Sequence, residues 1–168
     1  VTGETIRLTK KFNYNDIESL AKKIAKFKNR IACVILEPSS TECPKIYKNS
    51  SDCCNKAVCN RNFKKENHFL KQVEKLCKKN DIIFVLDEMI TGFRWDLKGA
   101  QHFYGVKPDI STFGKAMANG FSVSAICGKK KIMELGSITN NKQERVFLLS
   151  TTHGAEMNGL SAFMETVR

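Results

Sequence analysis

The feature that most constrains this chain is a buried strand that ends in two acidic residues. Residues 82–86 form an uninterrupted apolar run of branched and aromatic side chains, which is typical of a strand buried on both faces of a sheet. Asp87 and Glu88 follow this run at once. Open α/β folds bind their ligands at the carboxyl ends of such parallel strands. The sequence therefore predicts an α/β fold with acidic groups at its ligand-binding edge.

A second short strand in the same region ends close to a lysine. Residues 109–113 predict this strand, and Gly114 separates it from Lys115. A neutral lysine amine can attack an aldehyde and form a Schiff base. Taken alone, Lys115 could equally be an ordinary surface lysine. An acid and an amine at two strand ends together indicate a candidate reaction site.

The segments before this region alternate between helix and strand. A capping-box pattern, formed by Asn15 and Glu18, predicts the start of a helix. A second buried strand is predicted at 31–36 and ends at Glu37, and a helix follows at 69–79, with Asn67 as its expected cap. The first twelve residues indicate only a possible edge strand.

The segments after Lys115 continue the pattern. Strands are predicted at 123–127 and 146–149, and the last helix carries Met157, Leu160 and Met164. Because strand 31–36, helix 69–79 and strand 82–86 form a β-α-β unit, we expect a mostly parallel sheet with helices on both faces. A length of 168 residues favours one domain.

Residues 39–66 interrupt this order with a long polar stretch that contains four of the seven cysteines. We interpret it as a surface insertion. A zinc site is a weak alternative because no C-x-x-C pair occurs, so we expect no metal. An odd number of scattered cysteines, without a signal peptide or a membrane-length apolar run, is typical of the cytoplasm or an organelle matrix.

The net charge of +11 raises the question of a nucleic-acid partner. Residues 1–80 carry 18 Lys and Arg against 8 Asp and Glu, whereas residues 81–168 carry 10 against 9. The basic excess therefore lies outside the candidate reaction site. Solvated helix faces are the simpler interpretation, and a non-enzymatic basic module that binds nucleic acid or an acidic partner is the alternative function.

Two cofactor chemistries fit a strand that ends in Asp-Glu. An acid held beside a pyridine nitrogen keeps the ring protonated, so pyridoxal phosphate (PLP) enzymes pair such an acid with a lysine. A P-loop ATPase also has such a strand, but it requires G-x-x-x-x-G-K-[ST]. At Gly114-Lys115 the next residue is Ala116, and Asp109 stands where the first glycine should be. The chain therefore offers no phosphate cradle of the P-loop kind, and the acid and the lysine alone do not decide the chemistry.

The run DEMITGFRWDLKGAQHFYGVKPDISTFGKAMANGFSVSAICG resembles the cofactor-binding centre of class III PLP-dependent aminotransferases. It is most similar to the branch that contains glutamate-1-semialdehyde 2,1-aminomutase. The ERVFLLSTTHGAE run and the Glu37-Pro38 strand end resemble further segments of the same family. The resemblance implies a partial large domain of fold type I, with the N-terminal segment and the C-terminal small domain absent from these 168 residues.

The resemblance also implies roles for individual residues. Lys115 would form the Schiff base with the cofactor and shuttle a proton, and Asp87 would hold the pyridinium nitrogen. Met89 stands where the family usually has a small branched residue against the ring. Thr151 matches a threonine that bonds the cofactor phosphate of the neighbouring subunit, which implies a homodimer. Glu42 is a candidate for a substrate-side acid found in some members.

These implications give the function that we expect. The protein would transfer an amino group with PLP, as an aminotransferase or as an aminomutase, on a small-molecule substrate. We expect the isolated 168-residue fragment to be inactive, and we expect neither a membrane nor a nucleic acid as a partner. The substrate stays open at this point, because the resemblance does not choose between amino transfer between molecules and within one molecule.

Overall fold

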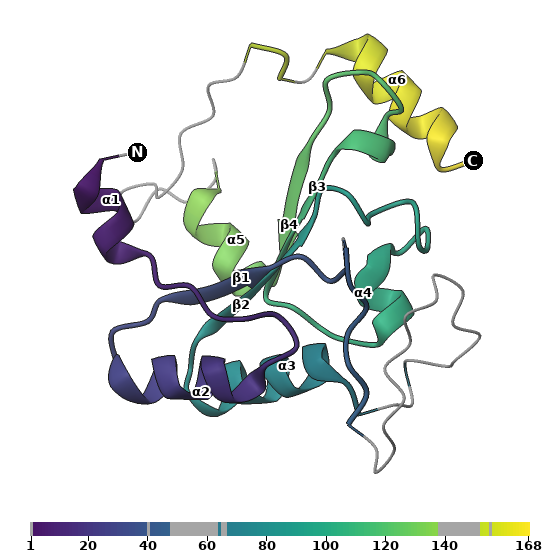
Figure 1. Ribbon diagram of the computed structural model, residues 1–168. Helices are drawn as coiled ribbons and strands as arrows, with labels where there is room; N and C mark the ends of the chain where they lie inside the picture. Colours follow the sequence, from purple (N-terminus) through teal and green to yellow (C-terminus); the bar gives the residue numbers. More distant parts are fainter. Residues whose placement is uncertain (1, 40, 48–63, 65–66, 138–151, 155) are drawn as a thin grey trace.

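A four-stranded sheet forms the centre of the molecule (Figure 1). The structure is a computed structural model that describes residues 2–39, 41–47, 64, 67–137, 152–154 and 156–168. The strand order is β1-β2-β3-β4; β1, β2 and β3 are parallel, and β4 is antiparallel to β3. The strands are β1 (Cys33–Leu36), β2 (Ile83–Glu88), β3 (Ile110–Phe113) and β4 (Ala125–Gly128). The predicted α/β class with a mostly parallel sheet is confirmed.

Helices lie on both sides of this sheet. Figure 1 shows α2 and α3 side by side under one face, and α5 on the other side, where it packs against β4. Two short 3₁₀ helices follow β3 and α5. The elements are α1 (Gly3–Leu8), α2 (Ile17–Lys26), α3 (Phe69–Lys79), α4 (Gly99–Tyr104), η2 (Lys115–Met117), α5 (Lys130–Met133), η3 (Glu134–Gly136) and α6 (Met157–Thr166).

The hydrophobic core lies between the sheet and the pair α2 and α3. Both helices are amphipathic and turn their apolar stripes toward the strands. Burying one large apolar side chain contributes about 1.5–3 kcal/mol, so this layer supplies much of the stability of the fold. Its members include Leu20, Ile24, Val34, Phe69, Leu70, Val73, Phe84 and Leu86.

The opposite face of the sheet is less well covered. Ile35 on β1 keeps 56% of its surface exposed and Ile126 on β4 keeps 50%. Val85, on the central strand β2, is buried. The described part of the chain therefore covers one face of its sheet fully and the other only in part.

The N-terminal predictions needed two corrections. Residues 3–8 form the helix α1 rather than an edge strand. The cap of α2 is Asp16, whose Oδ1 accepts from the Ser19 amide at 2.9 Å. Asn15 instead takes a left-handed conformation (φ 61°) and bonds Lys45 and Cys43, because its amide can pair with both a donor and an acceptor of that neighbouring segment.

The later elements depart from the sequence prediction at the helix α4 (Gly99–Tyr104), which the sequence patterns do not predict, and at one cap. The residue before α3 is His68, not Asn67. His68 is fully buried, and its ring lies 2.9 Å from the carbonyl of Tyr104, so tertiary packing rather than a polar cap defines this helix start. The predicted strand 146–149 and most of the insertion 39–66 lie outside the described residues.

The described cysteines form no disulfide, and the described helices do not have the character of membrane spans. The cysteines that the structure describes, at positions 33, 43, 77 and 127, carry free thiols. Burial raises the pKa of the Cys77 thiol to about 12. Within the described ranges, every helix is too short or too polar to cross a membrane.

Glu88 connects the end of β2 to α4. Its side chain is fully buried, and its two oxygens accept from the amides of Ala100 (2.5 Å) and Gln101 (2.9 Å), in the first turn of α4. A carboxylate at this position satisfies two amides that have no partner within the helix. Gly99, with φ 80°, is required here because a Cβ would lie 2.8 Å from both carboxylate oxygens.

Replacing Glu88 tests this connection. Burial raises the pKa of Glu88 above its ordinary value of 4.5, although the two amides oppose the shift. We expect Glu88→Gln to lower the free energy of unfolding by about 1–3 kcal/mol, because one buried amide loses its acceptor. The folded state binds the Glu88 proton more tightly than the unfolded chain does. The contribution of Glu88 protonation to the free energy of unfolding is therefore fully present below pH 4.5. It is lost as the pH rises through the pKa of Glu88 in the folded state.

Urea unfolding of both proteins between pH 4 and 7 measures the effect. The difference in the free energy of unfolding between wild type and Glu88→Gln should become smaller as the pH rises. A difference that becomes larger would contradict the expected pKa shift. Glu18→Gln, which changes an exposed residue of α2, is the control.

Candidate active site

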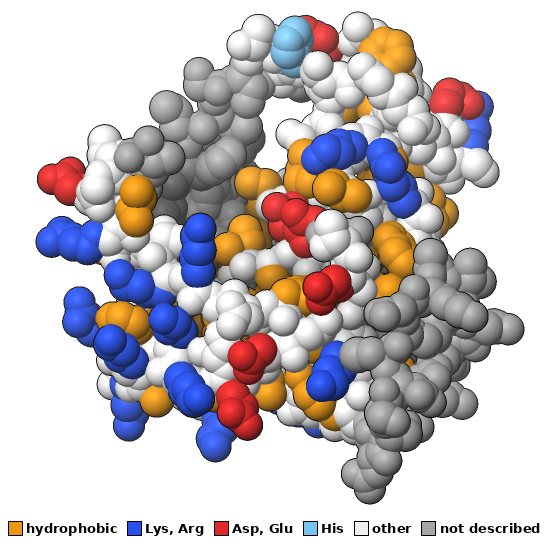
Figure 2. Space-filling view, in the orientation of Figure 1, with side chains coloured by type: hydrophobic (Ala, Val, Ile, Leu, Met, Phe, Trp, Pro, Cys, Tyr) orange, Lys and Arg blue, Asp and Glu red, His pale blue; other side chains and the backbone are white. Residues whose placement is uncertain are grey.

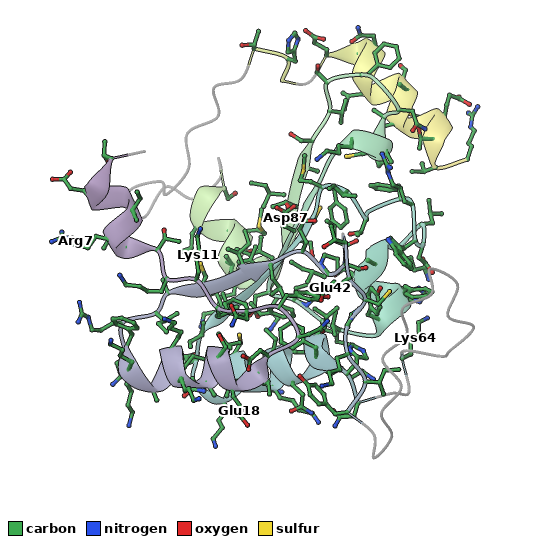
Figure 3. The ribbon with its side chains drawn as sticks, viewed as in Figure 1. Arg7, Lys11, Glu18, Glu42, Lys64 and Asp87 are labelled. Atoms are coloured by element: carbon green, nitrogen blue, oxygen red, sulfur yellow. The ribbon has the colours of Figure 1, made fainter. Side chains whose placement is uncertain are left out.

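Asp87 and Glu88 are adjacent in the sequence but serve different faces of the sheet. Successive side chains of a strand point to opposite sides, so Glu88 lies in the core with Leu86 and Asp87 does not. Asp87 is half-buried at the carboxyl end of β2, near the middle of the molecule in Figure 3. Asp87 is therefore the acid of this pair that is placed to meet a ligand.

The carboxylate of Asp87 is held through one of its two oxygens. Oδ1 accepts from the Thr112 hydroxyl at 3.0 Å and from the Met89 amide at 3.1 Å. Oδ2 has no hydrogen-bond partner among the described residues. The arrangement leaves one carboxylate oxygen available to accept a hydrogen bond from a bound molecule.

Lys115 lies at the same edge of the sheet as Asp87. Asp87 is paired with Thr112 and Glu88 with Phe113, so the parallel strands β2 and β3 end side by side. Lys115 comes two residues after β3, is exposed, and takes a left-handed conformation with φ 46°. The structure therefore brings the predicted acid and the predicted amine to the carboxyl ends of neighbouring strands.

Met89 and Gly114 follow the two strands and touch each other. A Cβ added to Gly114 would lie 3.0 Å from the Met89 sulfur and would also overlap the terminal methyl group. The long Met89 side chain thus occupies the space that a side chain at position 114 would need. Met89 is in this way placed between Asp87 and the backbone that leads to Lys115.

A cleft of about 250 Å³ opens beside the end of β1. Tyr14, Glu37, Thr41 and Glu42 line it. Glu37 follows the last residue pair of β1 and β2, which is Leu36 with Leu86, so it reaches the same edge as Asp87. Its Oε2 is buried and has no hydrogen-bond partner among the described residues. This cleft therefore offers an acidic acceptor next to the Asp87 edge.

Two residues of the cleft are held by contacts with the chain around them. The Tyr14 hydroxyl donates to the carbonyl of Pro38 at 2.5 Å, and burial raises the pKa of Tyr14. Glu42 is exposed and accepts from the Asn15 side chain at 3.2 Å. Glu42 therefore lies in the wall of the cleft, and its role as a substrate-side acid stays a prediction.

Two threonines complete the account of the site, Thr151 from the sequence prediction and Thr112 from the structure. Thr151 lies outside the described residues. Thr112 is part of the Asp87 environment but is not singled out by the sequence. Only the register of β2 against β3 identifies it, because a threonine inside a short strand has no signal of its own.

The basic excess of the first 31 residues lies away from the Asp87 edge. Figure 2 shows Lys and Arg side chains gathered at the lower left, over α2 and the preceding segment. Figure 3 places Arg7 and Lys11 on this side of the molecule and Asp87 near its middle. The amphipathic helix α2 accounts for three of the eight Lys and Arg residues of this segment, at positions 22, 23 and 26.

The sequence matches one protein family over most of its length, and this match includes the residues at the Asp87 edge. The model of the aminotransferase class-III family matches residues 62–168, which include Asp87, Met89 and Lys115. A glutamate-1-semialdehyde 2,1-aminomutase of Nitrosopumilus maritimus is 42% identical over 122 residues, covering 73% of this chain and 24% of the relative. A protein of the same name from Methanococcus vannielii is 33% identical over 168 residues, covering 100% of this chain and 34% of the relative.

Solved structures agree in fold. The PLP internal aldimine form of the FumI protein of Sphingopyxis sp. MTA144 superposes with a TM-score of 0.68 at 21% identity, over 94% of this chain and 33% of that chain. At this identity the likeness concerns the fold alone. This chain spans about a quarter to a third of the length of the two curated relatives.

The contact between Met89 and Gly114 yields a test of the site's packing. We expect Gly114→Ala to lower the free energy of unfolding by about 1–3 kcal/mol, because the new methyl group displaces the Met89 side chain. In a Met89→Ala background, Gly114→Ala should lower the free energy of unfolding by a clearly smaller amount. Urea unfolding of the four proteins gives the coupling between the two positions.

The control is Gly3→Ala, since a Cβ at Gly3 meets no atom within 4 Å. Equal costs of Gly114→Ala in both backgrounds would show that Met89 does not fill this space.

Proposed function

Because this chain belongs to the class III aminotransferase family, we propose that the protein moves amino groups with pyridoxal 5'-phosphate bound at the Asp87 edge. The observation that carries the proposal is Oδ2 of Asp87, which has no partner among the described residues, on a carboxylate that two donors already hold through Oδ1. A protonated pyridine nitrogen is a donor that fits such an acceptor. Lys115 stands at the end of the neighbouring strand with an exposed amine.

The cofactor supplies an electron sink for the carbon that loses a proton. The protein's residues do the rest. Asp87 would keep the ring nitrogen protonated, Lys115 would bind the cofactor carbonyl through its amine, and the same amine would move the proton at the substrate carbon once it is released. Met89 would border the cofactor, and its flexible thioether could adapt to the outline of a bound ring.

The finer parts of the proposal concern the whole protein. The substrate is a small molecule that gives or receives an amino group, and the reaction is an amino transfer between molecules or an amino shift within one. Thr151 would bond the cofactor phosphate of a partner subunit, so the working form would be a homodimer in the cytoplasm or an organelle matrix. The names of the curated relatives favour glutamate-1-semialdehyde as the first substrate to test.

The rival function is a non-enzymatic basic module. The basic stripe on α2 supports it only through charge, whereas the strand ends of β2 and β3 carry paired functional groups that a charged scaffold does not need. Steep loss of nucleic-acid affinity with added salt would be the mark of that alternative.

Trapping the lysine tests the first part of the proposal. Mixed with PLP and reduced with borohydride, the protein should carry the cofactor mass on the peptide that contains Lys115. Lys115→Ala should abolish the label on that peptide, because it removes the amine that is proposed to bind the cofactor. Lys107→Ala, which removes an exposed lysine before β3, is the matched control. Label spread evenly over many lysines would contradict the assignment.

Replacing Asp87 tests the second part. Asp87→Asn keeps the shape of the side chain but removes the charge that holds the ring proton. We expect PLP still to bind, while amino transfer falls by about 100-fold or more, the scale for losing one preorganised electrostatic group. Turnover of glutamate-1-semialdehyde, and of amino donors with 2-oxo acids, measures the effect in the full-length protein.

Asp81→Asn makes the same charge change just before β2, at the far end of the strand, and should leave turnover near the wild-type value. Undiminished turnover in Asp87→Asn would remove Asp87 from the mechanism.

A further inference from the structure

We infer that Thr112 is a positioning residue that fixes the rotation of the Asp87 carboxylate, so that Oδ2 faces the ring nitrogen of the cofactor. This inference rests on the proposed function, because it gives Thr112 a role only through Asp87. It adds a residue that neither the sequence motif nor the family match singles out.

The contact follows from the register of the sheet. Asp87 on β2 and Thr112 on β3 are directly paired in a parallel ladder, so their side chains point to the same face. The Thr112 hydroxyl donates to Asp87 Oδ1 at 3.0 Å. Thr112 is half-buried, and its β-branched side chain has few rotamers, which makes the hydroxyl a stable donor.

Two donors on one oxygen define the plane of the carboxylate. The Met89 amide also donates to Oδ1, at 3.1 Å, but an amide two residues along the chain is local and turns with the loop that follows β2. The Thr112 hydroxyl comes from a different strand and ties the carboxylate to the sheet. With both donors on Oδ1, Oδ2 is the oxygen left for the cofactor.

Other positions of β3 cannot replace Thr112. Ile110 and Gly114, two residues before and after it, provide no side-chain donor. Ser111 has a hydroxyl, but it is buried on the opposite face and donates to Gln101 Oε1 at 3.3 Å. Ser111 therefore offers a control that loses a hydroxyl hydrogen bond from the same strand without touching Asp87.

The experiment compares Thr112→Val, Thr112→Ser and Ser111→Ala in the PLP-loaded full-length protein, because we expect the isolated 168-residue fragment to be inactive. Valine keeps the shape of threonine and removes only the hydroxyl. We expect Thr112→Val to lower kcat about 10- to 100-fold, the range typical for residues that orient a functional group, while KM changes less than about threefold. Thr112→Ser should recover most of the rate because it restores the donor.

A second measurement reports on the ring itself. The pH midpoint at which the ring nitrogen of bound PLP loses its proton, followed by nitrogen NMR of isotope-labelled PLP, should fall in Thr112→Val, since a less well oriented Asp87 holds the ring proton less tightly, and it should return in Thr112→Ser. A purely structural role for Thr112 would not move this midpoint. Ser111→Ala should leave both the midpoint and kcat near wild type.

The outcomes separate the two proposals. If the wild-type protein takes up no PLP, the proposed function and this inference both fall. If it takes up PLP at Lys115 and Thr112→Val matches the wild type in kcat and in the midpoint of the ring nitrogen, only the role of Thr112 is overturned. If Ser111→Ala shows the same losses as Thr112→Val, the effect belongs to the stability of β3 and the inference is also overturned.

Discussion

The parallel register between β2 and β3 is the constraint on which the rest of the site depends. It pairs Asp87 with Thr112 and Glu88 with Phe113, and it ends both strands at the same edge. Because side chains alternate along a strand, a slip of one residue would move Asp87 into the core and Glu88 to the open face. The apolar run 82–86 prevents this slip, since Phe84 and Leu86 must face the helices α2 and α3.

Two adjacent acids can coexist at this edge because the fold gives them different partners. Glu88 is enclosed and bonds two helix amides, whereas Asp87 is partly open and bonds one hydroxyl and one amide. Glu88 also fixes where α4 begins and therefore limits the length of the loop after β2. That loop carries Met89, whose amide donates to Asp87. Glu88 therefore helps to position Asp87 through the backbone that follows β2.

The sequence predicts the fold further than it predicts local detail. The apolar runs and helical periodicities identify β1, β2, α2, α3 and α6, because each buries enough apolar surface to leave a pattern. The caps were less predictable: Asn15 and Asp16 are both good caps, and only the contact with Lys45 decides which one leaves the helix. Asp87 and Lys115 follow from motif and resemblance. Strand pairing places Thr112 and Glu37 near Asp87, and this pairing cannot be read from a single sequence.

The backbone at the edge adds a last constraint on the lysine. Six non-glycine residues of the described part have positive φ, and four of them are Asn or Asp, which tolerate this conformation. The other two are Phe93, after β2, and Lys115, after β3. The Phe93 ring packs 5.7 Å from that of Phe113, so the two unusual conformations flank the same strand ends. Left-handed backbone costs about 1–2 kcal/mol for such residues. The fold therefore holds Lys115 in a conformation that the chain alone would not choose, and this strain supports the proposal that the position of its amine is fixed.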